Sequence, residues 1–330
     1  WELNHGSPNL NISNKKGNKL IQSYIDELLE NKFIKIDDSE NVLLDEKLNL
    51  ETLKNSIFSC GINYVSLSSM SQLSQNIIGF NNLKDKIDFY FETFIVDLNF
   101  DNNHWNLISK NGEKFKTEYL VCSTNLLSHK RSLEILNIDK IPLRKAIPEN
   151  KDEKIDSLLN YLEKQKFIRR LTFLIYTSEN YSYKDFYSKK HRYFSLNKFL
   201  ENKYKFERVI FQSQKNNKLG IVVHSKNIDF IDSYIKAKDK DLIKQKIFNN
   251  FNKLFEGNSS INQLNGDEEI SIMKWRASQP SGCAVPLSLQ FSRKFQIGFC
   301  GDWFEGEGFA RIEGSILSAL ILFEKFKIFN

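Results

Sequence analysis

The chain has 330 residues, of which 41% are hydrophobic and 27% charged, a balance that indicates folded domains and excludes a disordered chain. Its 47 basic and 41 acidic residues give a formal net charge of +6, but the lysines are scattered among acids, so no nucleic-acid surface is indicated. No apolar run reaches the length of a membrane span and no signal-peptide pattern opens the sequence. We therefore expect a cytoplasmic protein that binds neither nucleic acid nor membrane.

The four cysteines indicate neither a disulfide framework nor a metal site. Each stands in an apolar or small-residue setting, and no Cys-x-x-Cys or Cys/His ligand spacing occurs. We expect free, buried thiols in a reducing compartment, and no bound metal. The cysteines are Cys60, Cys122, Cys283 and Cys300.

The first third of the chain predicts helices that alternate with short strands. Apolar residues at a helical spacing predict an amphipathic helix over residues 17–31, followed by strands at 33–36 and 41–44. Serines just before Met70 are suited to capping a second helix. The side chains expected to point inward from that helix are Met70, Leu73, Ile77 and Phe80.

A hairpin is expected next, because two strand-like runs flank the turn residues Asp101-Asn102-Asn103. The runs cover residues 87–100 and 104–109. A further strand is predicted at residues 114–123, where the chain becomes apolar again. These segments together predict a small antiparallel sheet.

Beyond about Arg131, longer helices alternate with strands, which indicates an α+β arrangement. An aromatic and basic stretch at residues 181–199 could stack nucleic-acid bases, but no wider basic face supports it, so we interpret it as a half-buried loop. The expected helices are residues 155–167 and 239–255, and the expected strands are residues 171–176, 208–212, 221–224 and 270–280.

The C-terminal stretch, residues 297–326, carries a strand, a turn and a helix. An apolar strand ends in Gly301-Asp302, and a glycine-spaced loop leads into a helix with small residues on one face. The first turn of such a helix favours an anion or a carbonyl oxygen, and Asp302 could accept hydrogen bonds from a polyol. The same pattern also fits a strand-turn-helix at a domain edge, with Asp302 as a turn residue. The apolar positions of the helix are Ile312, Ile316, Leu320, Phe323 and Phe326.

This stretch resembles the segment that closes the FAD domain in flavoproteins of the amine oxidase and renalase kind, where Gly-Asp precedes an Arg-x-Glu-Gly-small helix. The resemblance implies that Asp302 holds the ribityl chain of non-covalent FAD, and that the helix start lies under the pyrophosphate and the pyrimidine edge of the flavin. It also implies that the backbone at Ile95 contacts adenine, although Ile95 could equally be a core residue. The cofactor-binding residues so implied are Ile95, Gly301, Asp302, Arg311, Ile312, Glu313, Gly314 and Ser315.

Further motifs extend the resemblance over nearly the whole chain. Asn4-His5-Gly6 matches part of an Asp-His-Gly-Ala-Gln-Tyr-like segment, although the three residues that follow depart from it. A strand that ends in Lys-Trp-Arg carries Trp275 and Arg276, which would supply a flat wall and a fixed cation beside a planar ring. Taken alone, these motifs fit a plain loop and an edge strand. The residues implied on the substrate side are His5, Trp275 and Arg276, whereas a lone strand-end histidine such as His224 is more often structural.

The resemblance implies an α/β and α+β protein with two domains. One is an FAD/NAD(P)-binding, Rossmann-like domain of the glutathione-reductase and p-hydroxybenzoate-hydroxylase type, truncated at its N-terminus. Residues 1–9, 60–130 and 285–330 would form the remainder of this discontinuous domain. Residues 10–59 and 131–284 would form a mixed-sheet substrate domain.

The dinucleotide-binding turn of this family is missing from the sequence. None of the fourteen glycines forms a Gly-x-Gly-x-x-Gly pattern, since Gly306 and Gly308 are followed by Arg311 where the third glycine would stand. We therefore expect weak FAD binding by the sequence as printed.

Two functions remain. One is FAD-dependent hydride transfer from a small substrate, an amine or a nicotinamide-like molecule, to flavin N5, with reoxidation by oxygen. The other is a truncated or degenerate relative without FAD binding or catalysis.

Overall fold

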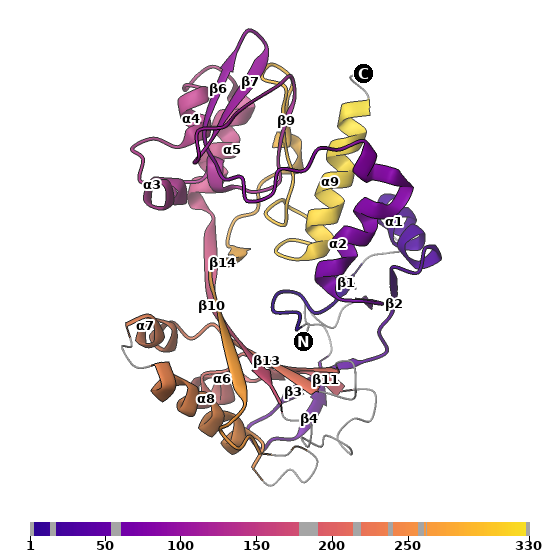
Figure 1. Ribbon diagram of the computed structural model, residues 1–330, viewed down its shortest axis with the longest axis vertical. Helices are drawn as coiled ribbons and strands as arrows, with labels where there is room; N and C mark the ends of the chain where they lie inside the picture. Colours follow the sequence, from indigo (N-terminus) through magenta and orange to yellow (C-terminus); the bar gives the residue numbers. More distant parts are fainter. Residues whose placement is uncertain are drawn as a thin grey trace. The chain divides into compact units, whose positions relative to one another are not determined.

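The chain folds around two main hydrophobic cores, one in each of two units (Figure 1). The computed structural model describes residues 3–13, 18–53, 61–177, 191–213, 219–236, 240–256, 261 and 263–327. Unit 1 comprises Trp1–Ser13, Asp26–Ile77 and Phe167–Ser278, and unit 2 comprises Asn14–Ile25, Ile78–Lys166 and Gln279–Asn330.

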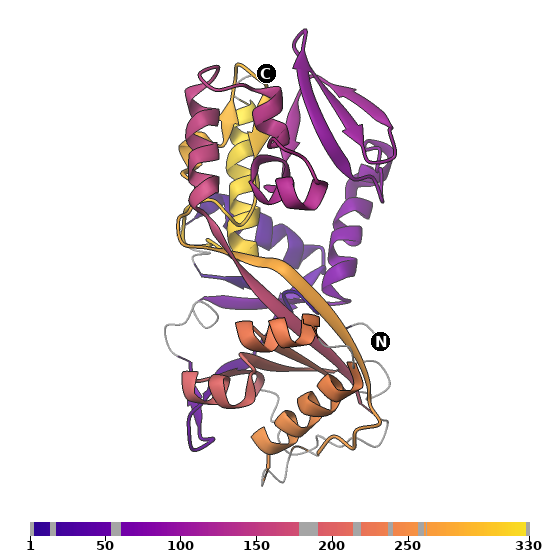
Figure 2. The ribbon, with the colours of Figure 1, turned by 90° about the vertical axis from the view of Figure 1, so that its left-hand side faces the viewer.

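Unit 1 is built on a seven-stranded mixed sheet with the strand order β14-β10-β13-β12-β11-β3-β4. Strand β3 runs parallel to β11, whereas β10 and β12 are both antiparallel to β13. The two long strands β10 and β14 lie side by side (Figure 2). The strands are β3 Glu40–Leu44, β4 Leu50–Thr52, β10 Lys166–Tyr176, β11 His191–Leu196, β12 Arg208–Ser213, β13 Leu219–Ser225 and β14 Glu269–Ser281.

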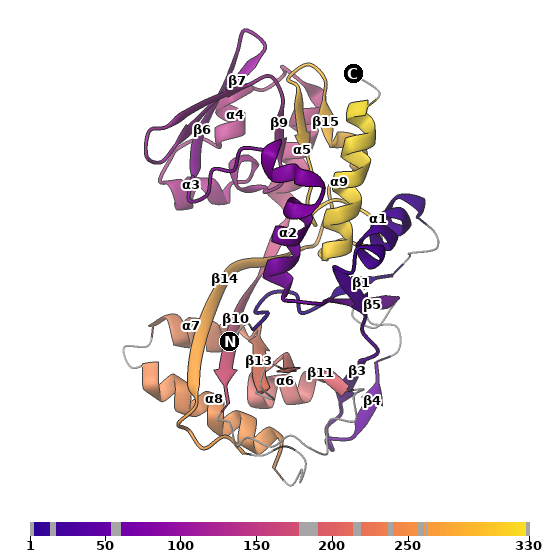
Figure 3. The same ribbon diagram turned by 45° about the vertical axis from the view of Figure 1, so that its right-hand side comes forward.

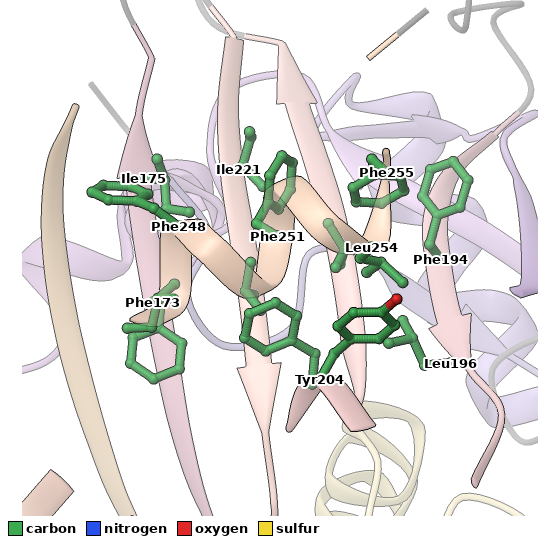
Figure 4. Packing of buried hydrophobic residues seen from close by; sticks show 14 of the residues in the cluster. Phe173, Ile175, Phe194, Leu196, Tyr204, Ile221, Phe248, Phe251, Leu254 and Phe255 are labelled. Atoms are coloured by element: carbon green, nitrogen blue, oxygen red, sulfur yellow. The ribbon is translucent and has the colours of Figure 1, made fainter. Parts of the chain in front are cut away.

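Helices pack an aromatic core against one face of this sheet (Figure 4). Because side chains alternate along a strand, Ile175 and Ile221, which are register partners on β10 and β13, reach this face together in the same cluster as Phe251 of the covering helix. Phe255 follows directly after the end of that helix, and its ring centroid lies 4.9 Å from that of Phe251. Each such side chain contributes about 1.5–3 kcal/mol by leaving water. The helices of unit 1 that follow β11 are α6 Lys198–Tyr204, α7 Ile228–Lys236 and α8 Lys240–Leu254.

The opposite face of the sheet meets the N-terminal segment of the chain. Leu3 belongs to a small cluster with Tyr193 and Val222. Gly220 leaves room for this side chain, because a Cβ at this position would lie 2.1 Å from a terminal methyl group of Leu3 and would force Leu3 to shift. A three-stranded antiparallel sheet, β1-β5-β2, completes unit 1 with strands β1 Leu10–Ile12, β2 Ile34–Ile36 and β5 Ile62–Ser66.

In unit 2, a small mixed sheet with the order β15-β16-β9 carries the C-terminal helix α9 (Figure 3). Strand β16 is parallel to β9 and antiparallel to β15, and α9 packs against β16. The elements are β9 Leu120–Cys122, β15 Phe291–Ser292, β16 Ile297–Phe299 and α9 Ile312–Lys327.

An antiparallel sheet β6-β7-β8 and short helices form the rest of unit 2. Asn102 and Asn103 both have left-handed backbone angles, which is the geometry of a tight two-residue hairpin turn. The carboxylate of Asp152 accepts hydrogen bonds from the first turn of α5 and caps that helix. The elements are β6 Ile95–Asp101, β7 His104–Ser109, β8 Lys114–Thr117, α3 Arg131–Leu136, α4 Pro142–Ala146 and α5 Glu153–Lys164.

Most of the expected elements are confirmed. The helix predicted at residues 17–31 is α1 Lys19–Glu30, and it buries Ile21, Ile25 and Leu28 on one face. The second helix is α2 Met70–Gly79, where Ser69 accepts a hydrogen bond from the backbone of Gln72 as its cap. The unit boundaries fall inside both helices.

Several expected boundaries and orientations are wrong. The strand expected from residue 87 begins only at Ile95, and the strand expected at residues 114–123 divides into β8 and β9, which belong to different sheets. Among the four side chains expected to point inward only Leu73 is buried, and Phe80 lies beyond the end of α2. In α9 the buried side chains are Glu313, Ser318 and Leu322, whereas Phe323 is 56% exposed.

The loop expected at residues 181–199 and the four cysteines are only partly covered by the described residues. Residues 178–190 and Cys60 lie outside the described residues, but residues 191–196 form the strand β11, so this part of the loop prediction is wrong. Cys122 and Cys300 are buried free thiols, and burial raises the pKa of Cys122 to about 12. Cys283 is only half-buried.

The boundaries between the two units lie at different residues from the boundaries of the two expected domains. Residues 1–9 and 60–77 belong to unit 1 with most of the expected substrate domain, and residues 131–166 belong to unit 2. Within the described ranges, no helix is long and apolar enough to cross a membrane. Nor does any group of three or more histidine, cysteine, aspartate or glutamate side chains in these ranges converge as a metal site.

Candidate functional site

The end of β16 turns sharply into the loop that carries Asp302. Gly301 has a φ of 148°, and a Cβ there would lie 2.2 Å from Nε1 of Trp303, so only glycine fits this position. The indole of Trp303 is 2% exposed, and its N–H has no acceptor among the described residues. This turn thus places a carboxylate and a buried, unpaired donor next to each other in the chain.

Ser318 fixes the end of β16 to α9. The backbone N–H of Gly301 donates to Oγ of Ser318 at 2.9 Å, and this Oγ lies 3.0 Å from the carbonyl oxygen of Gly301. The buried side-chain amide of Gln290 donates hydrogen bonds to the backbone carbonyl oxygens of Phe299 and Ser318. These contacts explain why a serine takes the buried side of the helix.

The Asp302 carboxylate is the group with the most perturbed acidity at this turn. Burial raises its pKa from 3.8 to about 6, and only its own backbone N–H offsets this shift. No described cation pairs with it. A largely buried carboxylate whose oxygens are not taken up by the protein can accept hydrogen bonds from ligand hydroxyls.

The loop before α9 approaches the helix start closely. The N–H of Gly314 donates to the carbonyl oxygen of Gly308 at 3.1 Å, and a Cβ on Gly314 would lie 2.2 Å from that oxygen. Ala310 closes the loop by donating to the carbonyl oxygen of Asp302 at 2.7 Å. The two glycines are therefore required by backbone packing inside the loop.

The other residues expected at the start of α9 mainly form contacts with one another. Arg311 and Glu313 form a buried ion pair with 2.6 Å between Nη2 and Oε2. Ile312 and Ser315 are half-buried, and Ser315 donates its N–H to the carbonyl oxygen of Arg311. The structure brings this expected set together with Asp302 in one loop and helix turn of unit 2.

Ile95 is the first residue of β6 and is half-buried. It pairs with Ser109 of β7, and its side chain packs against the main core of unit 2. Its side chain therefore has a packing role whether or not its backbone meets a ligand.

His5 and Trp275, expected on the substrate side, meet in unit 1. Their ring centroids are 5.5 Å apart and the planes are tilted by 35°. Trp275 donates its indole N–H to Oγ1 of Thr172 at 3.2 Å, and this Oγ1 lies 2.9 Å from Nδ1 of His224. Nδ1 of His5 is buried and has no hydrogen-bond partner among the described residues.

His224 is a structural residue at the end of the hydrogen-bonded series Trp275, Thr172 and His224. The strand register places it beside Thr172 on one side and Arg208 on the other. Burial, and then the nearby Arg208 and Arg170, lower its pKa from 6.5 to about 3. A neutral imidazole whose Nδ1 carries a lone pair can accept a hydrogen bond from the Thr172 hydroxyl, and Oγ1 of Thr172 in turn accepts one from the Trp275 indole N–H.

A buried charge cluster surrounds His224. Both oxygens of Glu207 accept from Arg170, at 2.9 and 3.1 Å, and Lys226 adds a contact at 3.1 Å. Burial alone would raise the pKa of Glu207, but Arg170, Arg208 and Lys226 lower it to about 2. Burial also lowers the pKa of Arg208 to about 10.

Arg276 does not join His5 and Trp275. It is exposed, and its side chain makes no ion pair or hydrogen bond within the described part of the chain. Consecutive residues of a strand point to opposite faces, so Arg276 cannot share the face on which Trp275 meets Thr172.

The sequence did not allow us to predict the polar residues that hold the candidate site residues in place. Ser318 and Thr172 are buried polar residues, and the Glu207 side chain is only 13% exposed, so each of them requires a partner. That signal was present, but the partners are 17, 52 and 37 residues away in the chain.

Comparison of the sequence with protein families gives no matching family model, and no curated protein matches it. Solved structures do resemble the fold. A triple mutant of putrescine oxidase matches with a TM-score of 0.53 at 8% identity, over 82% of this chain and 55% of that chain. Cyclohexylamine oxidase from Brevibacterium oxydans IH-35A matches with a TM-score of 0.52 at 10% identity, over 81% and 55%.

Wild-type putrescine oxidase bound to putrescine gives a TM-score of 0.51 at 9% identity, over 82% of this chain and 55% of that chain. This chain therefore spans 55% of the length of these oxidases. At such low identity the likeness shows the fold alone. It agrees with the amine-oxidase side of the resemblance and with a mixed α/β fold.

Proposed function

We propose that the protein is a flavin-dependent oxidoreductase with an amine-oxidase-like fold, and that Asp302 and the start of α9 hold FAD. The observation that carries this proposal is the carboxylate of Asp302, which is buried at the end of β16 without a cation. The likeness to putrescine oxidase and cyclohexylamine oxidase supports it, since both names describe enzymes that oxidise amines. Cofactor binding has been redesigned in putrescine oxidase.

The residues at this turn fit the central part of FAD. The ionised Asp302 can accept from ribityl hydroxyls, and the Trp303 indole N–H offers a donor that the protein leaves unpaired. FAD, when bound, would supply the hydride acceptor at N5. In this proposal Ile95 contacts adenine through its backbone, and the turn from Arg311 to Ser315 lies under the pyrophosphate and the flavin edge.

The adenosine and pyrophosphate ends would need a dinucleotide-binding turn that the described residues do not contain. We propose that further parallel strands of a Rossmann-like domain join at the free edge of β9, where no described strand pairs. The parallel β16–β9 pair is far too small to be stable alone, and Val121 of β9 is 49% exposed.

The substrate side in this proposal is the face of unit 1 that carries His5 and Trp275. Trp275 is fixed by Thr172 and offers a flat apolar wall, and Nδ1 of His5 is available for a polar group. The substrate is then a small molecule, an amine or a nicotinamide-like compound, and the enzyme acts in the cytoplasm. Arg276 would act through its exposed charge and not as part of this wall.

The experiment is to purify the complete polypeptide that the gene encodes and to record its visible spectrum. A yellow protein with flavin bands, whose flavin is released by acid precipitation, is expected. Asp302→Ala should weaken FAD retention by a factor of about ten or more, because one charge-assisted hydrogen bond is lost. Arg276→Ala should retain FAD, because Arg276 is exposed and is not among the residues proposed to hold the cofactor.

Two results would overturn this assignment. Equal flavin loss in the two variants would show that the cofactor and substrate sides are misassigned. A complete polypeptide that is colourless and does not take up added FAD would favour the alternative, a relative that has lost FAD binding and catalysis.

A further inference from the structure

Three polar side chains form a continuous hydrogen-bonded series across the main sheet of unit 1. The strand order places β10 between β14 and β13, and these strands carry Thr172, Trp275 and His224 respectively. The Trp275 indole N–H donates to Oγ1 of Thr172 at 3.2 Å, and this Oγ1 lies 2.9 Å from Nδ1 of His224. All three residues belong to unit 1, so the series is a feature of one unit.

The hydroxyl of Thr172 stands out within its strand. The residues on either side of it, Leu171 and Phe173, are apolar core residues, and all three are 0% exposed. Valine has the same branched shape as threonine and would fill this position without a polar atom. A buried hydroxyl costs free energy unless it is hydrogen-bonded. The contacts of this hydroxyl with Trp275 and His224 meet that requirement, and valine could make neither of them.

The direction of the series follows from the hydrogen-bonding capacity of each group. An indole N–H can only donate, so Oγ1 of Thr172 accepts from Trp275. Burial, and then Arg208 and Arg170, lower the pKa of His224 to about 3, so its imidazole stays neutral. With the lone pair on Nδ1, His224 accepts from the Thr172 hydroxyl, and the donor of each group then has an acceptor. His224 thereby orients the hydroxyl that holds Trp275.

Trp275 depends on this hydrogen bond for its orientation. Strand β14 is an edge of the seven-stranded sheet, and Trp275 is half-buried on it between the exposed Lys274 and Arg276. Its ring centroid lies 5.5 Å from that of His5, with the planes tilted by 35°. An edge strand has a neighbouring strand on one side only, and that side carries Thr172. The hydrogen bond to Thr172 therefore restrains the indole where packing is incomplete.

We propose that Thr172 is a positioning residue of the substrate side, whose hydroxyl holds the Trp275 indole in the orientation that places it beside His5. Because Thr172 takes up the indole N–H, Trp275 offers a bound molecule its apolar ring and no hydrogen-bond donor. A flat apolar group is favoured there over a group that needs a donor. The assignment of this wall to a substrate rests on the proposed function, whereas the restraint on Trp275 does not.

The test is hydrogen exchange of the Trp275 indole N–H, followed by NMR in the complete polypeptide with isotopically labelled tryptophans. Trp275→Phe identifies the signal, because it removes this one indole. In the wild type the N–H should exchange more slowly than that of free tryptophan. Thr172→Val should speed the exchange about fivefold, since one hydrogen bond is lost. Thr172→Ser keeps the hydroxyl and should retain the slow exchange of the wild type.

Thr177→Val is the matched control for a general loss of stability. Thr177 is also buried in unit 1, and its hydroxyl donates to the backbone carbonyl oxygen of Leu219. Its loss should lower the free energy of unfolding in urea without changing the exchange at Trp275. Equal exchange in Thr172→Val and Thr177→Val, or fast exchange in Thr172→Ser, would overturn the proposal. The wild type decides even if Thr172→Val does not fold, because an indole N–H that exchanges like free tryptophan would also overturn it.

The flavin spectrum of the same samples separates this proposal from the proposed function. A Trp275 indole protected through Thr172 in a colourless protein would sustain the positioning role and count against the oxidoreductase. Flavin bands in a protein whose Trp275 indole exchanges freely would do the reverse.

Discussion

Two half-buried carboxylates, Asp302 in unit 2 and Glu207 in unit 1, stand in opposite electrostatic surroundings. Burial raises the pKa of Asp302 to about 6, and no described cation offsets it. Burial acts on Glu207 in the same direction, yet three cations lower its pKa to about 2. The first carboxylate keeps its oxygens available for a ligand, whereas the second uses both of them inside the protein.

The comparison distinguishes a carboxylate whose pKa is shifted at a candidate ligand site from one whose pKa is shifted by ion pairs inside the fold. A shifted pKa alone would mark both residues as site candidates. The partners decide between them, because Glu207 is held by Arg170 through two hydrogen bonds and Asp302 is held by nothing of the kind. Three substitutions test this difference.

Glu207→Gln should have the largest effect. It removes the negative charge that Glu207 places beside Arg170, Arg208 and Lys226, which costs about 3–5 kcal/mol of the free energy of unfolding. Urea unfolding at pH 7 measures this loss. Glu46→Gln, at an exposed position of unit 1, should change the free energy by less than about 0.5 kcal/mol.

The pH dependence of the wild type sharpens this prediction. The pKa of Glu207 lies below its ordinary value of 4.5, so its contribution is complete above pH 4.5 and is lost as pH falls towards 2. Glu207→Gln should remove this acid-dependent part. If its unfolding free energy equals that of Glu46→Gln, the ion-pair cluster contributes nothing.

His224→Gln should have an intermediate effect that depends on pH. The pKa of His224 falls from 6.5 to about 3 on folding, so the unfolded chain binds the extra proton and wild-type stability falls as pH drops through this window. Between pH 6.5 and 4.5 this amounts to about 2 kcal/mol. The glutamine cannot titrate, so the variant should lose this slope.

A matched histidine in unit 2 provides the control. His104→Gln lies in the β6–β7 hairpin and should keep the wild-type slope in urea unfolding at pH 7, 6 and 5. A His224→Gln variant with the full wild-type slope would show that the histidine is not held neutral by burial.

The sequence predicted the neighbourhood of Asp302 because its determinants are local. The apolar strand, the required Gly301 and the helix period lie within residues 297–326, and β16 and α9 are found there. The orientation of α9 was mispredicted for the opposite reason. Ser318 turns inward because the backbone of Gly301, 17 residues away, uses its hydroxyl, and no periodicity rule contains that contact.

The surroundings of Glu207 could not be predicted in the same way. Arg170 and Glu207 are 37 residues apart, and they meet only because the sheet order places β10 and β12 on either side of β13. Strand register is set by long-range pairing, which a single sequence leaves open. Trp275 was predicted, but its link through Thr172 to His224 depends on the same register.

Asp302→Asn should have the smallest effect on stability, and its sign should be opposite to that of Glu207→Gln. The pKa of Asp302 rises on folding, so the stability that it contributes is present below pH 3.8 and is lost as pH rises through about 6. Asparagine avoids the cost of a buried charge, and because Asp302 is partly open to solvent we expect a gain of about 1–2 kcal/mol at pH 8 and none at pH 4. Asp139→Asn, an exposed position of unit 2, should show no such pH-dependent gain in urea unfolding.

The same Asp302→Asn variant should retain less FAD, because a charged acceptor becomes a neutral one. A protein that becomes more stable without ligand and binds its ligand less well is the signature of a residue kept for function. Loss of stability at pH 8 would instead place Asp302 with Glu207, as a carboxylate that the fold itself requires.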